Sequence, residues 1–231
     1  MKRFWKAVAV EPYEGGYRIT LDGRPIRTQG GRPQIVPNPA LAEALAEEWR
    51  AQRDEVDPGA FALRDLADYA IDHVRPDRAA AVDKLMPYGE TDTLCYRADP
   101  DEPLYPRQQA MWEPLLAAFE ARHGIRLERV SGVMHRPQPS ATMERLRALL
   151  EQQDDFTLAA LATLAPLAAS LSIALIALEP DRDVAGLFDA ANCEQDWQAE
   201  LWGWEPLAED ARAQRLAAFE VAAEFARLVS G

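Results

Sequence analysis

Two stretches of this sequence gather side chains that can do chemistry. Residues 88–97 bring together carboxylates, hydroxyls, a thiol and a guanidinium, and residues 194–203 bring together carboxylates, amides and two indoles. Such side chains are costly to bury without partners, and many of them are poor helix formers. We therefore expect each stretch either to be fixed by specific hydrogen bonds or to contact a ligand or a partner.

The first stretch offers two catalytic hypotheses. Cys95 could be a nucleophile with His73 or His135 as its base, but no nucleophile signature surrounds it, and its neighbours favour a small packing residue. Glu90 and Asp92 could be paired carboxylates, and the alternative is that Thr91 or Asp92 caps a short element while Arg97 pairs with a nearby acid. We favour the structural interpretation of both pairs.

The second stretch predicts a helix with an aromatic face. Its residues fall on two adjoining stripes, and Glu200 falls on a more polar side. The stripes are Glu194, Trp197, Leu201 and Trp204, and then Gln198 and Trp202. Tryptophan is common both in cores and in interfaces, and an aromatic face with an acidic rim is typical of a protein-binding surface. The pattern leaves core and interface equally open.

Composition narrows the classes of partner. The chain has 231 residues and a net charge of −13, from 38 acidic and 25 basic residues. This balance argues against nucleic acid and against an anionic membrane, and it suits a protein with basic patches. Two distant cysteines, three histidines without metal-ligand spacing and the absence of GxGxxG and Walker loops predict neither a metal nor a cofactor. No signal-peptide run follows the first residues, so we expect a cytoplasmic protein. Arginine greatly outnumbers lysine and alanine is abundant, which indicates a GC-rich bacterial genome.

The uncharged run 156–178 is long enough to span a bilayer. Pro166 and four hydroxyl groups interrupt it, and both of its flanks are acidic on balance, without a positive-inside signal. Much of the run is alanine, which allows helices to pack closely. We predict a buried helix of a bundle and no membrane insertion.

The chain begins with segments that predict a small antiparallel sheet covered by helices. Short runs that favour strands are separated by glycine turns, of which Asp22-Gly23 is a hairpin signal. These runs are residues 4–10, 17–21, 25–28 and 33–36. Helices are predicted at 39–53, with Asn38 as the N-cap, and at 63–74.

Helix dominates the remainder of the chain, where residues 126–130 are the one clear strand candidate. The predicted helices are 78–87, 106–123, 140–152, 154–179, 183–203 and 206–229. A helix break at Arg75-Pro76 therefore separates a domain of residues 1–75 from a mainly helical domain of residues 76–231. The expected fold class is α+β, with a small N-terminal α/β domain followed by an all-α orthogonal helical domain.

An ordered set of motifs, spread over nearly the whole chain, resembles a known family. The motifs are Arg3-Phe4-Trp5-Lys6, Leu21-Asp22-Gly23-Arg24-Pro25, Glu48-Trp49, Ala70-Ile71-Asp72, Thr91-Asp92-Thr93-Leu94-Cys95-Tyr96-Arg97, Trp112 with Pro114-Leu115-Leu116, and Gln198-Ala199-Glu200-Leu201-Trp202-Gly203. Together they resemble the assembly-factor-twelve chaperones of the F-type ATP synthase. The resemblance implies a non-enzymatic, ATP-independent chaperone that holds the unassembled α subunit of the catalytic head until the β subunit displaces it. We expect it to act as a monomer.

The resemblance also implies roles for particular residues. It points to an important glutamate in the C-terminal domain, either Glu200, which lies in the Gln-x-Glu-x-Trp-Gly match, or Glu194. The partner-binding residues expected from it are Glu194, Gln198, Glu200 and Trp202. The residues expected to act structurally are Trp49, Asp92, Tyr96 and Arg97.

A second class of function stays open beside the chaperone. Asp92, Cys95 and Arg97 could line a cleft between the two domains and form a small-molecule-binding enzyme, since such clefts are common ligand sites. Turnover or a retained ligand would favour the enzyme. Saturable, stoichiometric binding to one protein would favour the chaperone.

Overall fold

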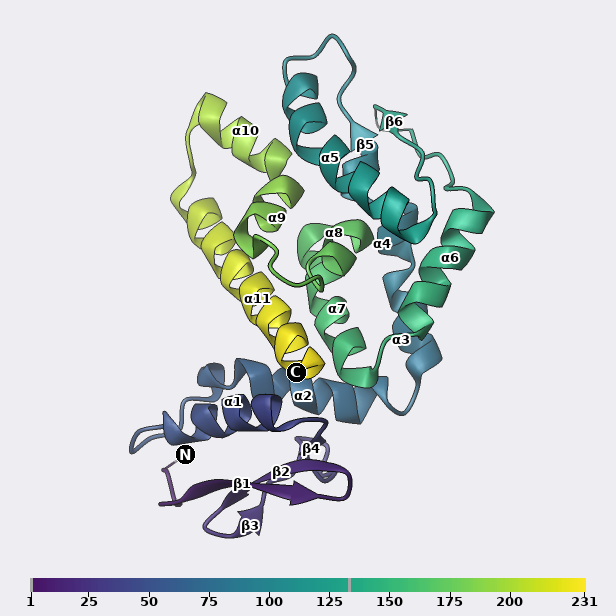
Figure 1. The fold of residues 1–231 in the computed structure, drawn as a ribbon. Helices are drawn as coiled ribbons and strands as arrows, with labels where there is room; N and C mark the ends of the chain where they lie inside the picture. The colour runs from purple at the N-terminus through teal and green to yellow at the C-terminus, as the bar shows by residue number, and fades with distance from the viewer. Residues whose placement is uncertain (1, 133) are drawn as a thin grey trace. The chain divides into compact units, whose positions relative to one another are not determined.

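The computed structural model describes residues 2–132 and 134–231, and its contacts divide the chain into two units. Unit 1 is made of Met1–Arg78, Asp154–Ala160 and Glu224–Gly231, and unit 2 is made of Ala79–Gln153 and Leu161–Ala223. The α+β class is confirmed, because a small antiparallel sheet comes first and helices follow (Figure 1). The boundary predicted at residue 75 did not include the two later segments of unit 1.

The sheet of unit 1 is built around its second strand. The strands are β1 (Val8–Tyr13), β2 (Gly16–Leu21), β3 (Arg24–Pro25) and β4 (Ile35–Val36). β2 pairs antiparallel with each of the other three. The β2–β3 turn has Asp22 at φ 50° and Gly23 at φ 77°, the left-handed geometry that the Asp-Gly signal predicts.

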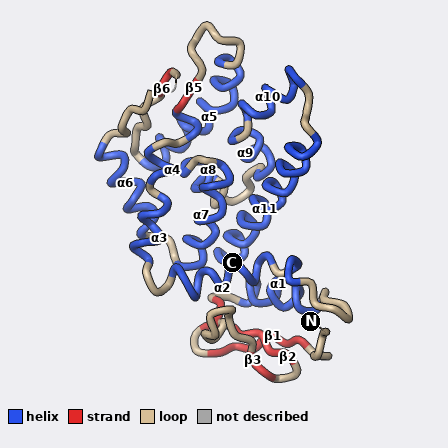
Figure 2. Tube along the Cα trace, turned by 180° about the vertical axis from the view of Figure 1, so that it is seen from behind, coloured by secondary structure: helices blue, strands red, loops and turns tan. Residues whose placement is uncertain are grey.

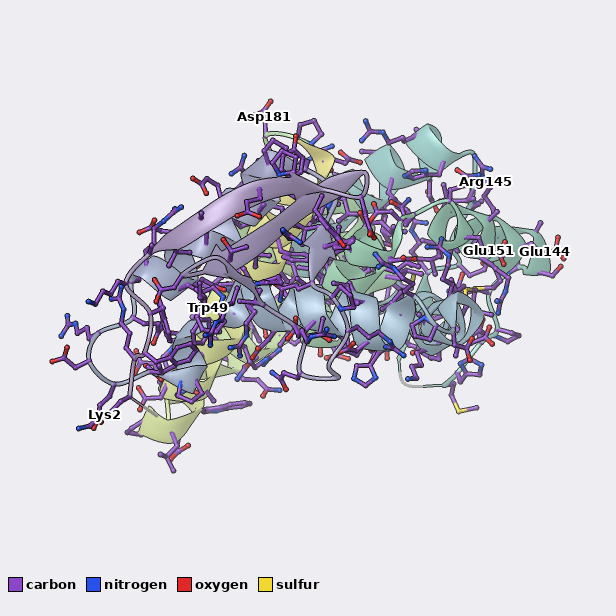
Figure 3. All side chains as sticks on the ribbon, turned by 90° about the horizontal axis from the view of Figure 1, so that it is seen from below. Lys2, Trp49, Glu144, Arg145, Glu151 and Asp181 are labelled. Carbon is purple, nitrogen blue, oxygen red and sulfur yellow. The ribbon has the colours of Figure 1, made fainter. Side chains whose placement is uncertain are left out.

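Helix α1 (Pro39–Arg50) lies across one face of this sheet (Figure 1). The side chain of Asn38 caps it by accepting a hydrogen bond from the Leu41 backbone at 2.9 Å, as predicted. Trp49, labelled in Figure 3, packs between Trp5 and Phe61 with ring centroids 5.0 and 4.6 Å away. This aromatic cluster joins the start of the chain to α1.

Unit 1 is completed by the helices that follow α1 and by two segments from later in the chain. The short helix η1 (Pro58–Ala60) leads to α2 (Ala62–Tyr69), which continues into the π-helical turn η2 (Ala70–Val74). The Asp155 carboxylate pairs with Arg75 at 2.9 Å and with Arg78. The side-chain amide of Asn38 donates to the carbonyls of Leu228 and Val229 at 2.9 and 2.8 Å.

The regular structure of the described residues of unit 2 is helical apart from one short pair of strands. Its elements, three of which also extend into unit 1, are α3 (Arg78–Leu85), α4 (Pro87–Glu90), η3 (Thr93–Cys95), β5 (Tyr96–Arg97), α5 (Tyr105–His123), β6 (Val130–Ser131), α6 (Ser140–Glu151), α7 (Asp155–Ala168), α8 (Leu171–Ile176), α9 (Val184–Ala191), α10 (Cys193–Trp202) and α11 (Pro206–Ser230). β5 and β6 pair in parallel, and they are the two labelled red segments that lie side by side in unit 2 in Figure 2. The predicted strand 126–130 is therefore shorter and lies later in the sequence.

Two predicted helices are each broken in two, and both predictions were wrong in this respect. The helix expected at 154–179 ends at Ala168, near Pro166; Ala169 takes φ 46°, and Ser170 caps α8 by accepting from the Ile173 backbone at 3.0 Å. The helix expected at 183–203 breaks at Asn192, whose side chain donates to the Phe188 carbonyl at 2.7 Å. Among the residues described, no helix is long and apolar enough to cross a membrane.

Candidate functional site

The two stretches that carry polar and aromatic chemistry meet at one pocket in unit 2. The pocket has a volume of about 590 Å³ and is lined by β5, the loop after it and α10. Five of the eight predicted site residues line it: Tyr96, Arg97, Glu194, Gln198 and Trp202. Asp92, Glu200 and Trp49 are not among the lining residues, and Trp49 belongs to unit 1.

Helix α10 presents one continuous face to this pocket. The lining residues on it follow the i, i+3, i+4, i+7, i+8 spacing of a single helical face, and they are Glu194, Trp197, Gln198, Leu201 and Trp202. Gly203, at φ 86°, ends the helix, so Trp204 lies beyond it. Trp202 is 76% exposed and Leu201 is 55% exposed. The face is therefore not core, and of the two alternatives left open the structure favours an interface.

Further apolar side chains extend this face beyond α10. Trp204, in the loop before α11, and Leu207, in the first turn of α11, are also exposed, and with Leu201 and Trp202 they form what we call the apolar patch. Arg212 holds the junction together, because its guanidinium binds Asp196 at 2.6 Å and lies over the Trp204 ring at 6.0 Å. The apolar patch is thus exposed to solvent, while Arg212 links its Trp204 side to α10.

Gln108 links the residue that follows β5 to α10, and sequence reasoning missed it. Its side-chain nitrogen donates to Glu194 at 2.8 Å, and its oxygen accepts from the Ala98 backbone at 2.8 Å. It is fully buried and shares the inner face of α5 with Trp112 and Leu116. A glutamine on an otherwise apolar stripe was the available signal.

The pocket leaves the charge of Glu194 without a counter-ion. Desolvation raises the pKa of Glu194, the hydrogen bond from Gln108 opposes that rise, and the nearby charge of Glu102 adds to it. The side chain is nevertheless accessible, because the burial comes from the wall of an open pocket. Within the described part of the chain, neither Glu194 nor Glu102 forms an ion pair.

Glu200 is engaged differently from Glu194. Its carboxylate forms a two-pronged ion pair with Arg107 on α5, with N–O distances of 2.5 and 2.8 Å. The hydrogen bond and the charge of Arg107 lower the pKa of Glu200. The same guanidinium lies 5.7 Å from the centre of the Trp197 ring. Glu200 therefore links α10 to α5, and its own charge is already balanced.

Asp92 is a buried anchor that ties η3 to the start of α8. Its carboxylate accepts hydrogen bonds from the Leu94 backbone at 3.1 Å, the Ser170 hydroxyl at 2.7 Å and the Ser172 backbone at 2.8 Å. Desolvation raises its pKa, and these hydrogen bonds oppose the rise. Of the two residues predicted as a cap, Thr91 and Asp92, it is Asp92 that forms the N-cap of η3.

Cys95 is fully buried, and burial, together with the charge of Asp92, raises the pKa of its thiol. A buried thiol with a raised pKa is a poor nucleophile. Since Asp92 is also fully buried, neither group is accessible to a dissolved substrate. Among the residues that the structure describes, no group of three His, Cys, Asp or Glu side chains could hold a metal ion.

Tyr96 and Arg97 line the pocket from β5. The Arg97 side chain is 4% exposed and pairs with Glu113 at 2.8 Å, as the predicted pairing with a nearby acid requires. It also donates to Gln109 and to the Leu94 carbonyl. The Tyr96 hydroxyl lies 3.0 Å from a ring nitrogen of His135. Arg97 is therefore held by internal partners and contributes a fixed wall.

Comparison with known proteins agrees with this architecture. Residues 2–120 match the family model described as ATP12 chaperone protein. The crystal structure of Atp12 from Paracoccus denitrificans is 37% identical, with a TM-score of 0.94 over 99% of this chain and 98% of that chain. A lysine-substituted mutant of the same protein gives a TM-score of 0.95 at 37% identity, over 99% of this chain and 97% of that chain.

A more distant relative is also similar over most of its length. The mitochondrial protein atp12 of Schizosaccharomyces pombe is 26% identical over 214 residues, which is 87% of this chain and 74% of the relative. The family model covers more than half of the chain, and the bacterial crystal structure covers nearly all of it. The chain therefore belongs to the ATP12 chaperone protein family.

Proposed function

We propose that this protein is an ATP-independent assembly chaperone that binds the unassembled α subunit of the F-type ATP synthase head. It would prevent aggregation of that subunit and hand it on to the β subunit. The observation that carries the proposal is the exposed apolar patch beside the acidic pocket of α10, in a chain that belongs to a chaperone family.

The proposal has a simple physical basis. A subunit without its neighbours exposes a large, partly apolar interface, and such surfaces aggregate. Exposed indole and leucine side chains can cover part of that interface. Unit 2 contains 22 acidic and 12 basic residues, a net charge of −10, and this charge would keep the complex in solution.

The α10 surface supplies the proposed contacts. Glu194, Gln198 and Trp202 line the pocket and would contact the client directly, whereas Glu200 would act by holding Arg107 and the adjoining turn of α10. We assign structural roles to Trp49, Asp92, Tyr96 and Arg97. The burial of Asp92 and Cys95 supports a non-enzymatic function over the small-molecule enzyme.

Co-expression with the α subunit from the same genome tests the function. Gel filtration of the soluble fraction should give a one-to-one complex with the wild-type protein and aggregated α subunit without it. Glu200→Lys should reduce the soluble complex, because the new cation repels Arg107. Glu144→Lys is the matched control, since Glu144 is exposed and points outward from α6 (Figure 3). A wild-type protein that neither binds nor keeps the α subunit soluble would overturn the proposal.

A further inference from the structure

The α10 pocket contains two carboxylates that have only neutral partners. Glu194 accepts one hydrogen bond from the Gln108 amide at 2.8 Å, and Glu102 accepts one from the Asp99 backbone at 3.3 Å. Arg97 is the one basic residue among the described residues that line the pocket, and Glu113 already pairs with it at 2.8 Å. The pocket is therefore acidic and has no counter-ion of its own among those residues.

Aromatic and aliphatic groups surround these carboxylates. The indoles of Trp197 and Trp202 line the same pocket, and Leu201 lies between them on α10. Indole faces attract ammonium and guanidinium groups, and the Arg107 guanidinium near the Trp197 ring shows that this face of the helix already accommodates one cation. A carboxylate beside an indole is a suitable site for a second cation.

The site is also held in place before a client arrives. Gln108 is fully buried and positions the Glu194 carboxylate, while the Arg107–Glu200 ion pair fixes the next turn of α10. A site that is ordered in advance loses little conformational entropy on binding. The exposed Trp202 side chain can still adjust to the client.

We propose that this pocket takes a lysine or arginine side chain from a client segment whose neighbouring residues are large and apolar. The inference rests on the proposed chaperone function and names the chemistry of the segment that is bound. A purely apolar segment would desolvate Glu194 and Glu102 without pairing them, and an acidic segment would add repulsion. A basic residue pairs with the carboxylates, and its apolar neighbours cover the patch.

Matched peptides test this proposal directly. Two fluorescein-labelled peptides of alternating leucine and a second residue, arginine in one and glutamine in the other, are titrated with the full-length protein, and binding is followed by anisotropy. At about 0.15 M salt, which screens distant charges, the arginine peptide should bind on the order of tenfold more tightly. Glu194→Gln and Glu102→Gln should each remove most of that preference, and Trp202→Ser should weaken both peptides.

The controls separate a specific pocket from general charge attraction. Glu144→Gln and Asp181→Asn each remove one exposed negative charge outside the pocket, and Asp181 has a φ of 58°, a geometry that asparagine also adopts. Both variants should bind like wild type. Equal binding of the two peptides, or an effect of these controls as large as that of Glu194→Gln, would overturn the proposal.

The result is distinguishable from a failure of the chaperone function. If co-expression gives a soluble complex with the α subunit but the peptides show no preference, the function stands and the pocket assignment fails. If the α subunit is not held but the arginine peptide still requires Glu194 and Glu102, the pocket chemistry stands and the client is a different protein. Glu102 lies on an exposed loop, so its variant keeps the test valid should Glu194→Gln fold poorly.

Discussion

Residues 88–97 and 194–203 have similar chemistry, but the fold uses them in opposite ways. In the first stretch Asp92 is enclosed by donors of its own chain, and Arg97 is paired with Glu113. In the second, Glu194 is accessible and has a single neutral partner, and Trp202 is largely exposed. The number of internal partners, rather than the type of residue, distinguishes a structural carboxylate from one available to a partner.

Asp92→Ala should produce the largest effect on stability. It leaves the Ser170 hydroxyl and the Leu94 and Ser172 backbone groups without an acceptor in a buried site. We expect the free energy of unfolding to fall by about 3 kcal/mol, measured by urea denaturation followed by circular dichroism. Trp202→Ser is the counterpart from the exposed stretch, and its free energy of unfolding should stay within about 0.5 kcal/mol of wild type.

An equal loss of stability in both variants would contradict the contrast between the two stretches. A stable Asp92→Ala variant would show that the desolvation of the carboxylate outweighs its three hydrogen bonds. In that case the cost of burying the carboxylate, which also raises the pKa of Asp92, would decide its net contribution to stability.

Exchanging the charges of Arg107 and Glu200 tests whether Glu200 acts through its ion pair. Glu200→Lys and Arg107→Glu should each weaken binding of the α subunit about tenfold, because each places like charges opposite one another. The double variant restores an opposite pair and should recover most of the affinity, measured by surface plasmon resonance. No recovery in the double variant would mean that Glu200 contacts the client itself.

Glu113 and Glu194 should change the free energy of unfolding in opposite directions as the pH is varied. Desolvation works against Glu113, but the ion pairs with Arg129 and Arg97 hold its pKa below the ordinary value of 4.5. Its stabilising contribution is therefore present above pH 4.5 and is lost as the pH falls through the folded-state pKa. The pKa of Glu194 is raised, so its contribution is present below pH 4.5 and is lost as the pH rises through the folded-state pKa.

Glutamine substitutions make this difference measurable. The stability deficit of Glu113→Gln relative to wild type should shrink as the pH is lowered below 4.5. Glu194→Gln should instead gain stability relative to wild type as the pH is raised above 4.5. Urea midpoints from pH 3 to 7, converted to free energies, give both curves, and curves of the same sign would refute the assignment.

Trp49→Phe should have only a small effect on stability. The indole N–H of Trp49 is buried and has no hydrogen-bond partner among the described residues, so phenylalanine removes an unpaired polar group. We expect the free energy of unfolding to change by less than about 1 kcal/mol. Trp112→Phe should cost about 1 kcal/mol more, because the Trp112 indole donates to the Ala190 carbonyl at 2.8 Å. The reverse order would contradict this account.

Local chemistry made much of the fold predictable. The Asp22-Gly23 turn and the Asn38 cap depend on residues that are adjacent in sequence, and both are confirmed. The break after Ala168 was missed because it depends partly on Asp92, which binds the Ser170 hydroxyl 78 positions away. The residue pattern of one segment cannot predict a hydrogen-bond partner that lies far away in the sequence.

In the candidate site, too, local features were predicted and contacts between distant segments were not. Helical periodicity placed Glu194, Gln198 and Trp202 on adjoining stripes, and the structure confirms that they share one surface. Gln108 and Glu102 lie on other elements, and the Gln108–Glu194 hydrogen bond spans 86 positions. Whether a glutamate is already neutralised, as Glu200 is by Arg107, depends on packing between helices and has no signature in the sequence.

The cap of α1 also constrains the order in which the protein can fold. Asn38 binds the carbonyls of Leu228 and Val229, about 190 positions further along the chain, so unit 1 closes around a segment that is synthesised after all of unit 2. Contacts of such long range are slow to form. During synthesis the α1 region would lack these contacts until residues 224–231 have been made. This member of a chaperone family thus has an incomplete stage of its own, during which the surface that receives those residues is open to solvent.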